Sequence, residues 1–401
     1  MQFKLLNFHK LIGNFASSLV GTFIPLIIYK ATGSLRLAVL FLFGQCLCRI
    51  IANHLFKKLY NNYPQLTLIL RVIPLLVYNI SLIFLQDFLV LGIILTTISY
   101  GVSLSFKNNA LGVLLNYSSQ KKSKNKLTIT RIIESVSAII ASVAGGLFID
   151  WNQTALIIFS LSLYIISVLP LIIYYIINKG NVGFNKDFTS NAAEEYDKDP
   201  ILKQKRKSMV KTFVFQYFLF YAIFCVVDTF TNMYSLHIFL SVPTFAVAGY
   251  FSAVFQAANL AGVLFIRWLS KKVDLKTLNT IFGIVCALPL GLLPFIQNYA
   301  IIYPLIFIFG FSYAVCSFFM MDALMTKCKI INATNNALLA RQDGLMVGQM
   351  VTPIIVIIFN SVVPMFFAMV MAVIVYSIYT HIVEEKLRKK LVNYLENNEI
   401  E

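Results

Sequence analysis

The chain has 401 residues, of which 59% are hydrophobic and 12% are charged, whereas soluble domains carry about 25% charged residues. A chain this apolar cannot cover itself with a water-compatible surface, which excludes an ordinary soluble domain and predicts a protein that lies in lipid. The net charge of +16 would suit nucleic acid. The basic residues, however, lie in short hydrophilic gaps between apolar runs, as they do in membrane proteins, so we expect no nucleic-acid partner.

A membrane-spanning helix needs roughly 20 residues, and the sequence contains apolar runs of about that length. In chain order, these twelve runs cover 11–29, 37–56, 66–84, 88–106, 127–148, 155–177, 212–236, 244–266, 278–296, 301–321, 338–359 and 364–382. The expected fold class is therefore an all-α membrane protein of about twelve transmembrane helices, which crosses the lipid bilayer of the inner or plasma membrane many times.

The distribution of basic residues predicts the orientation. With both chain ends placed in the cytosol, 26 of the 33 lysines and arginines fall on the cytosolic side, and only Lys30 and Arg36 fall outside. Cytosolic loops are enriched in lysine and arginine, so we expect both termini in the cytosol.

One long polar stretch divides the chain into two sets of six apolar runs. We expect an N-terminal six-helix bundle over 1–177, a cytosolic linker over 178–211, a C-terminal six-helix bundle over 212–383 and a cytosolic tail over 384–401.

An internal repeat connects the two halves. The segments 99–111 and 312–324, in the fourth span of each half, are identical at six of thirteen positions. Two parallel halves of this kind are typical of transporters in which one half rocks against the other around a central site.

The first span and the turn after it carry a family resemblance. Residues 14–21 read NFASSLVG, and Tyr29 begins a Tyr-x-x-Thr-Gly-Ser turn. This opening resembles the drug-efflux-like branch of the major facilitator superfamily, which implies two six-helix bundles and export of a hydrophobic or amphipathic compound by proton antiport. The chain departs from the family at Phe56, where the signature between the second and third spans has aspartate. The segment 141–146 also lacks the proline of the antiporter signature.

Asp228 is the main candidate for proton coupling. It follows the apolar run 213–227, and at 1.5 Å per residue it lies about 24 Å along a helix that begins at Thr212. We expect no basic residue at this depth, and burial then favours the protonated form of the carboxylate. The alternative is a polar group hydrogen-bonded to hydroxyls at a water-filled vestibule. Glu134 and Asp322 are the further candidates for proton coupling.

Charged residues near the cytosolic ends of the spans predict a cytosolic gate. The set consists of Lys107, Arg131, Glu134, Asp322, Arg341 and Asp343. Charges in a span are costly and usually serve a function. Arg131 and Glu134 share one helical face and would alternatively form an intrahelical ion pair, and the whole set would alternatively be a structural network. Arg341 and Asp343 point to different faces, so each should have a partner on another helix.

Smaller polar groups within the spans predict a substrate cavity. Together with Asp228, these are Asn14, Ser17, Ser18, Gln45, Gln216, Gln256, Asn259 and Gln349. The four histidines have no metal-ligand spacing, and the chain contains no Gly-x-x-x-x-Gly-Lys phosphate loop. We therefore expect neither an enzyme nor a cofactor or metal.

The expected function is secondary active transport of a small organic solute by alternating access, carried out by a monomer. Proton-coupled export of a hydrophobic or amphipathic compound is the first expectation. Uptake of a nutrient or metabolite is the alternative within transport. A transport-dead membrane scaffold or sensor is the alternative outside it.

Overall fold

The computed structural model describes residues 2–119, 124–177, 200–269, 273, 275–330 and 334–396, and the regular elements of this part of the chain are helices. The first half contains α1 (Gln2–Gly21), α2 (Ile24–Thr32), α3 (Leu35–Leu55), α4 (Lys57–Asn62), α5 (Pro64–Leu70), α6 (Val72–Ile83), α7 (Leu89–Ser119) and α8 (Lys124–Ile177). The second half contains α10 (Pro200–Phe224), the 3₁₀ helix η2 (Cys225–Thr229), α11 (Phe230–Ser241), α12 (Phe245–Leu269), α13 (Leu275–Leu292), η3 (Leu293–Phe295), α14 (Tyr299–Ile330), α15 (Thr334–Phe359) and α16 (Val363–Glu396). Residues 200–211, expected in the linker, are thus part of α10, and 178–199 lie outside the described residues.

Within the described residues, eleven stretches are long and apolar enough to cross a membrane, and one of them, in α8, is 39 residues long. The backbone of α8 is extended at Asn152 (φ −156°, ψ 101°). On one side of this break, a Cβ atom at Gly145 would lie 2.5 Å from the carbonyl oxygen of Leu19. On the other side, the Ser160 hydroxyl donates to the carbonyl oxygen of Ala16 at 2.7 Å.

These two contacts show that α8 folds back on itself. Gly145 and Ser160 would be about 22 Å apart in a straight helix, yet both contact the same turn of α1. The segment is therefore two antiparallel spans, and the expectation of about twelve transmembrane helices is confirmed.

The Thr-Gly-Ser segment between the first and second spans forms a tight turn that ends α2 and begins α3. Gly33 adopts a left-handed conformation (φ 64°) and donates its N–H to the Tyr29 carbonyl, a helix ending that glycine permits without steric cost. The next residue, Ser34, caps α3 by accepting the Leu37 N–H at 3.4 Å. The chain is thus sharply reversed between α2 and α3.

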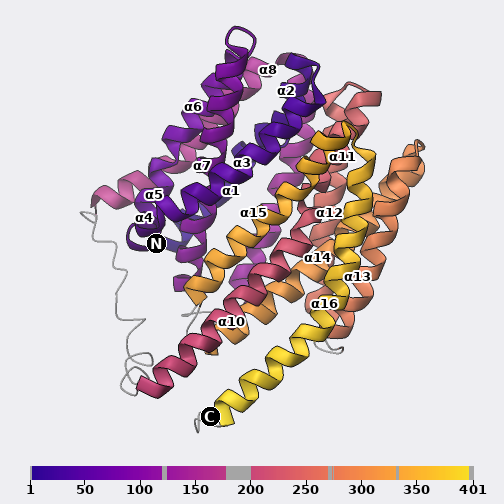
Figure 1. Cartoon of the computed structure of the whole chain (residues 1–401). Helices are drawn as coiled ribbons and strands as arrows, with labels where there is room; N and C mark the ends of the chain where they lie inside the picture. Colours follow the sequence, from indigo (N-terminus) through magenta and orange to yellow (C-terminus); the bar gives the residue numbers. More distant parts are fainter. Residues whose placement is uncertain are drawn as a thin grey trace.

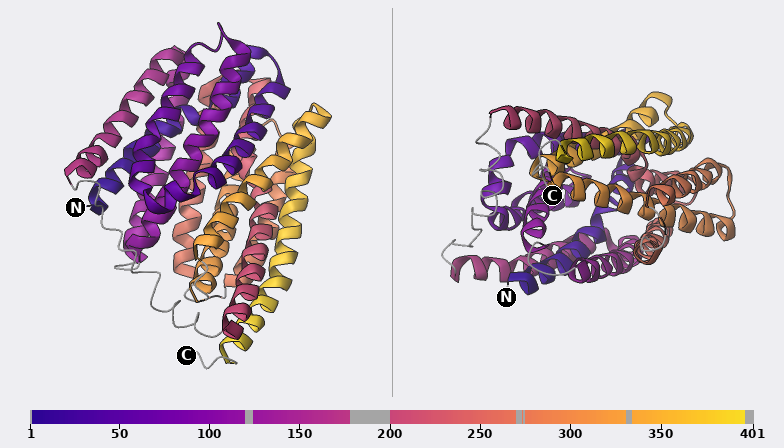
Figure 2. Two further views of the ribbon diagram at one scale, coloured as in Figure 1. Left: turned by 60° about the vertical axis from the view of Figure 1, so that its left-hand side comes forward. Right: turned by 90° about the horizontal axis from the view of Figure 1, so that it is seen from below.

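The two halves of the chain lie side by side (Figures 1 and 2). In the first half the fourth span is α7. It packs against the second span, α3, and against the third span, which consists of α5 and α6. In the second half the fourth span, α14, packs in the same way against α12 and α13. The repeated segments 99–111 and 312–324 therefore lie in helices with equivalent neighbours.

Between the halves, α8 and α12 approach closely because small residues face each other. A Cβ atom at Gly146 would lie 2.6 Å from the Phe245 carbonyl oxygen, so only glycine permits this approach. One turn away along α8, the hydroxyls of Ser142 and Ser252 are 3.1 Å apart. The helices α3 and α15 also pack against each other, which gives two helix pairs that join the halves.

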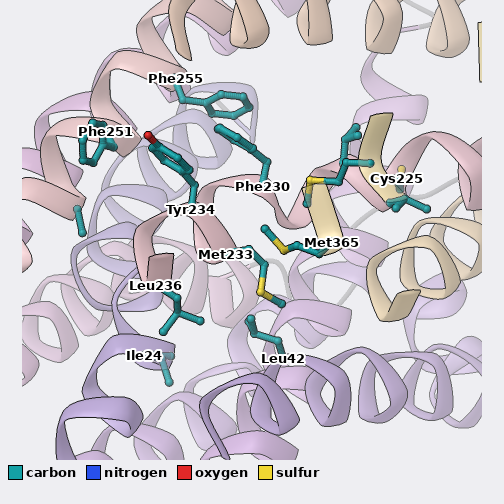
Figure 3. Close-up of a cluster of buried hydrophobic side chains, with 14 of the residues drawn as sticks. Ile24, Leu42, Cys225, Phe230, Met233, Tyr234, Leu236, Phe251, Phe255 and Met365 are labelled. Atoms are coloured by element: carbon teal, nitrogen blue, oxygen red, sulfur yellow. The ribbon is translucent and has the colours of Figure 1, made fainter. Parts of the chain in front are cut away.

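The core runs across this boundary. Figure 3 shows Met233, Leu236 and Met365 of the second half beside Ile24 and Leu42 of the first half, all buried. The outer surface is also apolar. Leu55, Val90 and Trp151 are each at least 70% exposed, among many other large hydrophobic side chains (72%, 70% and 75%). Such a surface suits a lipid environment.

Candidate functional site

Asp228 lies where the seventh span changes from α-helix to 3₁₀ helix, in η2 between α10 and α11. Its Oδ1 accepts a short hydrogen bond from the Tyr313 hydroxyl on α14, and its Oδ2 accepts one from Gln349 Nε2 on α15 at 3.2 Å. The next residue, Thr229, shares a hydroxyl–hydroxyl bond of 2.6 Å with Thr352 of α15. Three spans of the second half therefore meet at this carboxylate.

The hydrogen-bonded chain continues into the first half. Gln349 Oε1 accepts a bond from the thiol of Cys46 on α3, with a sulfur–oxygen distance of 3.6 Å. Asp228, Gln349 and Cys46 thus link the seventh, eleventh and second spans across the boundary. A rearrangement of α3 against α15 would change the surroundings of Asp228.

Asp228 is hydrogen-bonded to a hydroxyl, as the alternative from the sequence expected, and arginines of two other spans act on it electrostatically. Asp228 has the two hydrogen-bond donors above, and it interacts electrostatically with Arg341 of α15 and Arg49 of α3. The depth of an arginine Cα does not give the depth of its guanidinium, because the long side chain extends along the helix surface. Both arginines therefore act on Asp228 although they lie farther along their spans.

Asp343 of the predicted gate has partners on another helix, as expected. Its Oδ1 accepts a hydrogen bond from Asn53 Nδ2 at 3.3 Å, and its Oδ2 lies 3.0 Å from His54 Nε2. One turn before Asn53, Arg49 donates from Nη2 to Gln342 Oε1 at 2.8 Å. The helices α3 and α15 are thus joined by polar contacts at what we call the Asp343 end of the bundle.

The rest of the predicted gate is only partly described. The Arg341 guanidinium lies over the ring of Tyr221 on α10, 5.3 Å from its centroid. Lys107 is half-buried on α7. The side chains of Arg131, Glu134 and Asp322 lie outside the described part of the structure.

A second polar link between the halves lies at the opposite end of the bundle, which we call the Asp150 end. The carboxylate of Asp150 on α8 accepts the backbone N–H groups of Phe245 and Ala246 at 3.1 and 2.9 Å. These are the first residues of α12, where free N–H groups and the helix dipole favour a negative charge. Lys30, at the end of α2, lies 5.2 Å from the centroid of the Phe245 ring.

The described hydrogen bonds place only some of the predicted cavity residues. Asp228 and Gln349 are in contact, whereas Gln216 accepts a short bond from Tyr379 of α16. Ser17 donates to the Gly13 carbonyl at 2.6 Å and accepts a bond from Arg71 at 3.0 Å. The remaining predicted residues, Asn14, Ser18, Gln45, Gln256 and Asn259, are half-buried on α1, α3 and α12.

Several polar residues of the site were not predicted from the sequence. Arg49 and Asn53 follow the predicted Gln45 at four-residue spacing, which places all three on one face of α3, and this spacing was the signal for a polar stripe. Arg71 of the third span is 2% exposed and also donates to Ser103 at 3.0 Å. Asp150 gave no signal, because a carboxylate at the end of a span is ordinary.

Comparison with known proteins agrees with this architecture. The solved structure of a bacterial homologue of the iron transporter ferroportin, in an inward-facing state, matches with a TM-score of 0.67 at 12% identity, covering 94% of this chain and 97% of that one. The xylose transporter XylE from E. coli matches with a TM-score of 0.65 at 11% identity, covering 94% and 95%. The nucleoside transporter NupG matches with a TM-score of 0.60 at 13% identity, covering 98% of each chain. No curated protein sequence matches the chain.

The fold is that of a multi-pass membrane protein with two packed halves. The family model of the Major Facilitator Superfamily matches residues 10–338. The chain therefore belongs to the Major Facilitator Superfamily, the family that its first span resembles.

Proposed function

We propose that this chain is a proton-coupled secondary active transporter that moves a small organic solute by alternating access. The observation that carries the proposal is Asp228, a carboxylate inside a span whose hydrogen-bond chain reaches the other half through Gln349 and Cys46. A coupling group must have different surroundings in two states, because only a differential free energy shifts an equilibrium. Movement of α3 against α15 supplies such a difference.

The polar links at the two ends support alternating access. Opening the Asp343 end requires separation of Asn53 and His54 from Asp343, and opening the Asp150 end requires release of Asp150 from α12. Two ends closed by separate contacts can open in turn. With the orientation expected from the basic residues, the Asp343 end is cytosolic.

Aromatic side chains beside Asp228 support a hydrophobic or amphipathic substrate. The ring of Phe224 stacks on Tyr313, with centroids 5.2 Å apart, and the Phe255 ring lies 5.7 Å from that of Tyr313. The tyrosine hydroxyl that bonds Asp228 is therefore embedded in apolar surface. Together with the resemblance of the first span to drug-efflux-like transporters, this favours export of such a compound in exchange for protons.

A second candidate function is uptake together with protons, and one observation favours it. Arg49 and Arg341 both interact with Asp228, so protonation of this carboxylate leaves a positive interior that attracts an anion. A proton and an anion that bind together move in the same direction.

The test is a flux screen with the purified protein in liposomes. Hydrophobic, amphipathic and anionic compounds are supplied with a pH gradient of either sign, and the controls are protein-free liposomes and a protonophore. We expect movement of at least one compound against its own gradient, which the protonophore abolishes. Movement opposite to the protons identifies export, and movement with them identifies uptake. Flux that is the same with and without a pH gradient would refute proton coupling.

A further inference from the structure

Two arginines from opposite halves lie at the same contact between α3 and α15. Arg49 of α3 is 6% exposed and donates to Gln342, the residue that follows Arg341 on α15. Because Arg49 hydrogen-bonds the chain neighbour of Arg341, two cationic side chains lie at one contact between the halves. Like charges placed together away from water are unfavourable unless something neutralises them.

Each of these guanidinium groups keeps an unused donor. The Nε atoms of Arg49 and Arg341 are both buried and have no hydrogen-bond partner among the described residues. A buried donor on a charged group that stays unsatisfied costs about 1–3 kcal/mol or more. Two such donors at one boundary indicate a place where an acceptor binds.

The neighbouring carboxylates among the described residues do not fill this role. Asp228 interacts electrostatically with each of them, but its oxygens accept bonds from Tyr313 and Gln349. Asp343, on the same contact between α3 and α15, accepts a hydrogen bond from Asn53 and lies 3.0 Å from His54. Both carboxylates therefore have other partners, while the buried Nε donors of Arg49 and Arg341 stay unsatisfied among the described residues.

We propose that Arg49 and Arg341 form a binding site for the anionic group of the transported compound, an organic carboxylate or phosphate. Guanidinium groups suit such ligands because their planar forks bind two oxygen atoms at once. The Tyr221 ring under Arg341 offers apolar surface to the rest of the molecule. A ligand held by α3 and α15 together draws the halves toward each other at this boundary.

The inference rests on the proposed function, specifically on its uptake candidate. An anion beside Asp228 binds more tightly when that carboxylate carries no charge, so the proton and the anion travel together. The site itself is tested by equilibrium binding, which requires no transport. Failure of proton coupling and failure of the anion site are thus separate results.

The experiment measures binding to the purified full-length protein in lipid nanodiscs by the shift of its thermal unfolding midpoint with ligand concentration. Three probes carry on one phenyl ring an anionic, a neutral polar or a cationic group: benzoate, benzamide and benzylamine. Phenyl phosphate and inorganic phosphate complete the series. The variants are Arg49→Gln, Arg341→Gln, Arg49→Lys, Arg341→Lys and Asp228→Asn. The control is Arg388→Gln, which removes an exposed cation of α16.

We expect benzoate or phenyl phosphate to stabilise the parent protein and the Arg388→Gln variant, whereas benzamide and benzylamine have no effect. Each arginine-to-glutamine variant should weaken anion binding about tenfold or more, as loss of a charged hydrogen bond does, and the lysine variants should retain part of it. Asp228→Asn should bind the anion more tightly. A preference for phenyl phosphate over benzoate assigns the ligand as a phosphate.

Three results would overturn the site. The first is that no anion stabilises the parent protein. The second is that benzamide binds as well as benzoate. The third is that a glutamine variant which elutes as a folded monodisperse protein binds the anion as tightly as the parent.

Discussion

Asn53 of α3 donates a hydrogen bond to the carboxylate of Asp343 on α15, and this contact joins residues 290 positions apart in the chain. It holds the two halves together at the Asp343 end, beside the contact between Arg49 and Gln342. The family signature between the second and third spans has an acidic residue where this chain has Phe56. Here the acidic residue of the contact lies on α15, and its polar partners lie on α3.

The first prediction concerns this contact. Asn53→Ala should favour opening at the Asp343 end, because a hydrogen bond to a charged group contributes about 1.5–3 kcal/mol, equivalent to about tenfold or more in an equilibrium constant. Spin labels at Lys57 and Lys386 report the distance between the halves there, and the longer-distance population should grow. Glu385→Gln, which removes ion pairs with Lys276 and Lys389 within the second half, should leave the distribution unchanged. An unchanged distance distribution in Asn53→Ala would show that this contact does not hold the Asp343 end closed.

The second prediction concerns the opposite end. Asp150→Ala removes the acceptor at the N-terminus of α12, an interaction of the kind that contributes about 1 kcal/mol in helix caps. Spin labels at Arg36 and Asn298 should therefore show more of the open state at the Asp150 end. The control is Asp87→Ala, which removes an exposed carboxylate from the loop between α6 and α7. The prediction fails if the Asp150 and Asp87 variants behave alike.

The third prediction concerns the close approach of α8 and α12. Gly146→Ala should destabilise the protein by about 1–3 kcal/mol, the usual cost of overpacking, because the new methyl group would meet the Phe245 carbonyl at 2.6 Å. Gly291→Ala is the matched control, since its nearest neighbour would be 3.9 Å away. Thermal unfolding in nanodiscs measures the difference. Equal midpoints for both variants would contradict the packing between the halves.

The fourth prediction concerns orientation in the membrane. In a cysteine-free background, single cysteines at Asn152 and Asn298 should react with a membrane-impermeant thiol reagent added outside intact cells. Cysteines at Ser123 and Lys389 should react only after the cells are opened, because the basic loops are expected inside. Labelling of a cysteine at position 123 from outside intact cells would contradict the predicted topology.

The helices were predictable and their contacts were not. Hydropathy identified the spans because each must satisfy its own backbone groups in lipid. Hydropathy did not predict local breaks within a span, such as η2 in the seventh span, because the change from α-helix to 3₁₀ helix depends on packing. The partners of Asp228 lie 85 and 121 positions away, at Tyr313 and Gln349, and a single sequence does not reveal which helical faces meet.

The candidate site was therefore found only in part. Asp228 was identifiable because a charge in an apolar run is unusual, and Asp343 because it needed a partner on another helix. Arg49 was not predicted, because its partner Gln342 on α15 lies 293 positions away in the chain. Asp150 became meaningful only when the N-terminus of α12 was seen to contact it.

The central claim is that Asp228 couples transport to protons, and Asp228→Asn tests it most directly. The compound found in the flux screen is offered to liposomes that contain the parent protein or the variant. One measurement is accumulation of the compound driven by a pH gradient. The other is exchange of labelled for unlabelled compound, in liposomes loaded with the compound and without a gradient. Asparagine mimics the protonated side chain at nearly constant volume, so the variant should lose gradient-driven accumulation and keep exchange. A variant that accumulates the compound against its gradient as well as the parent does would show that Asp228 is not the coupling group.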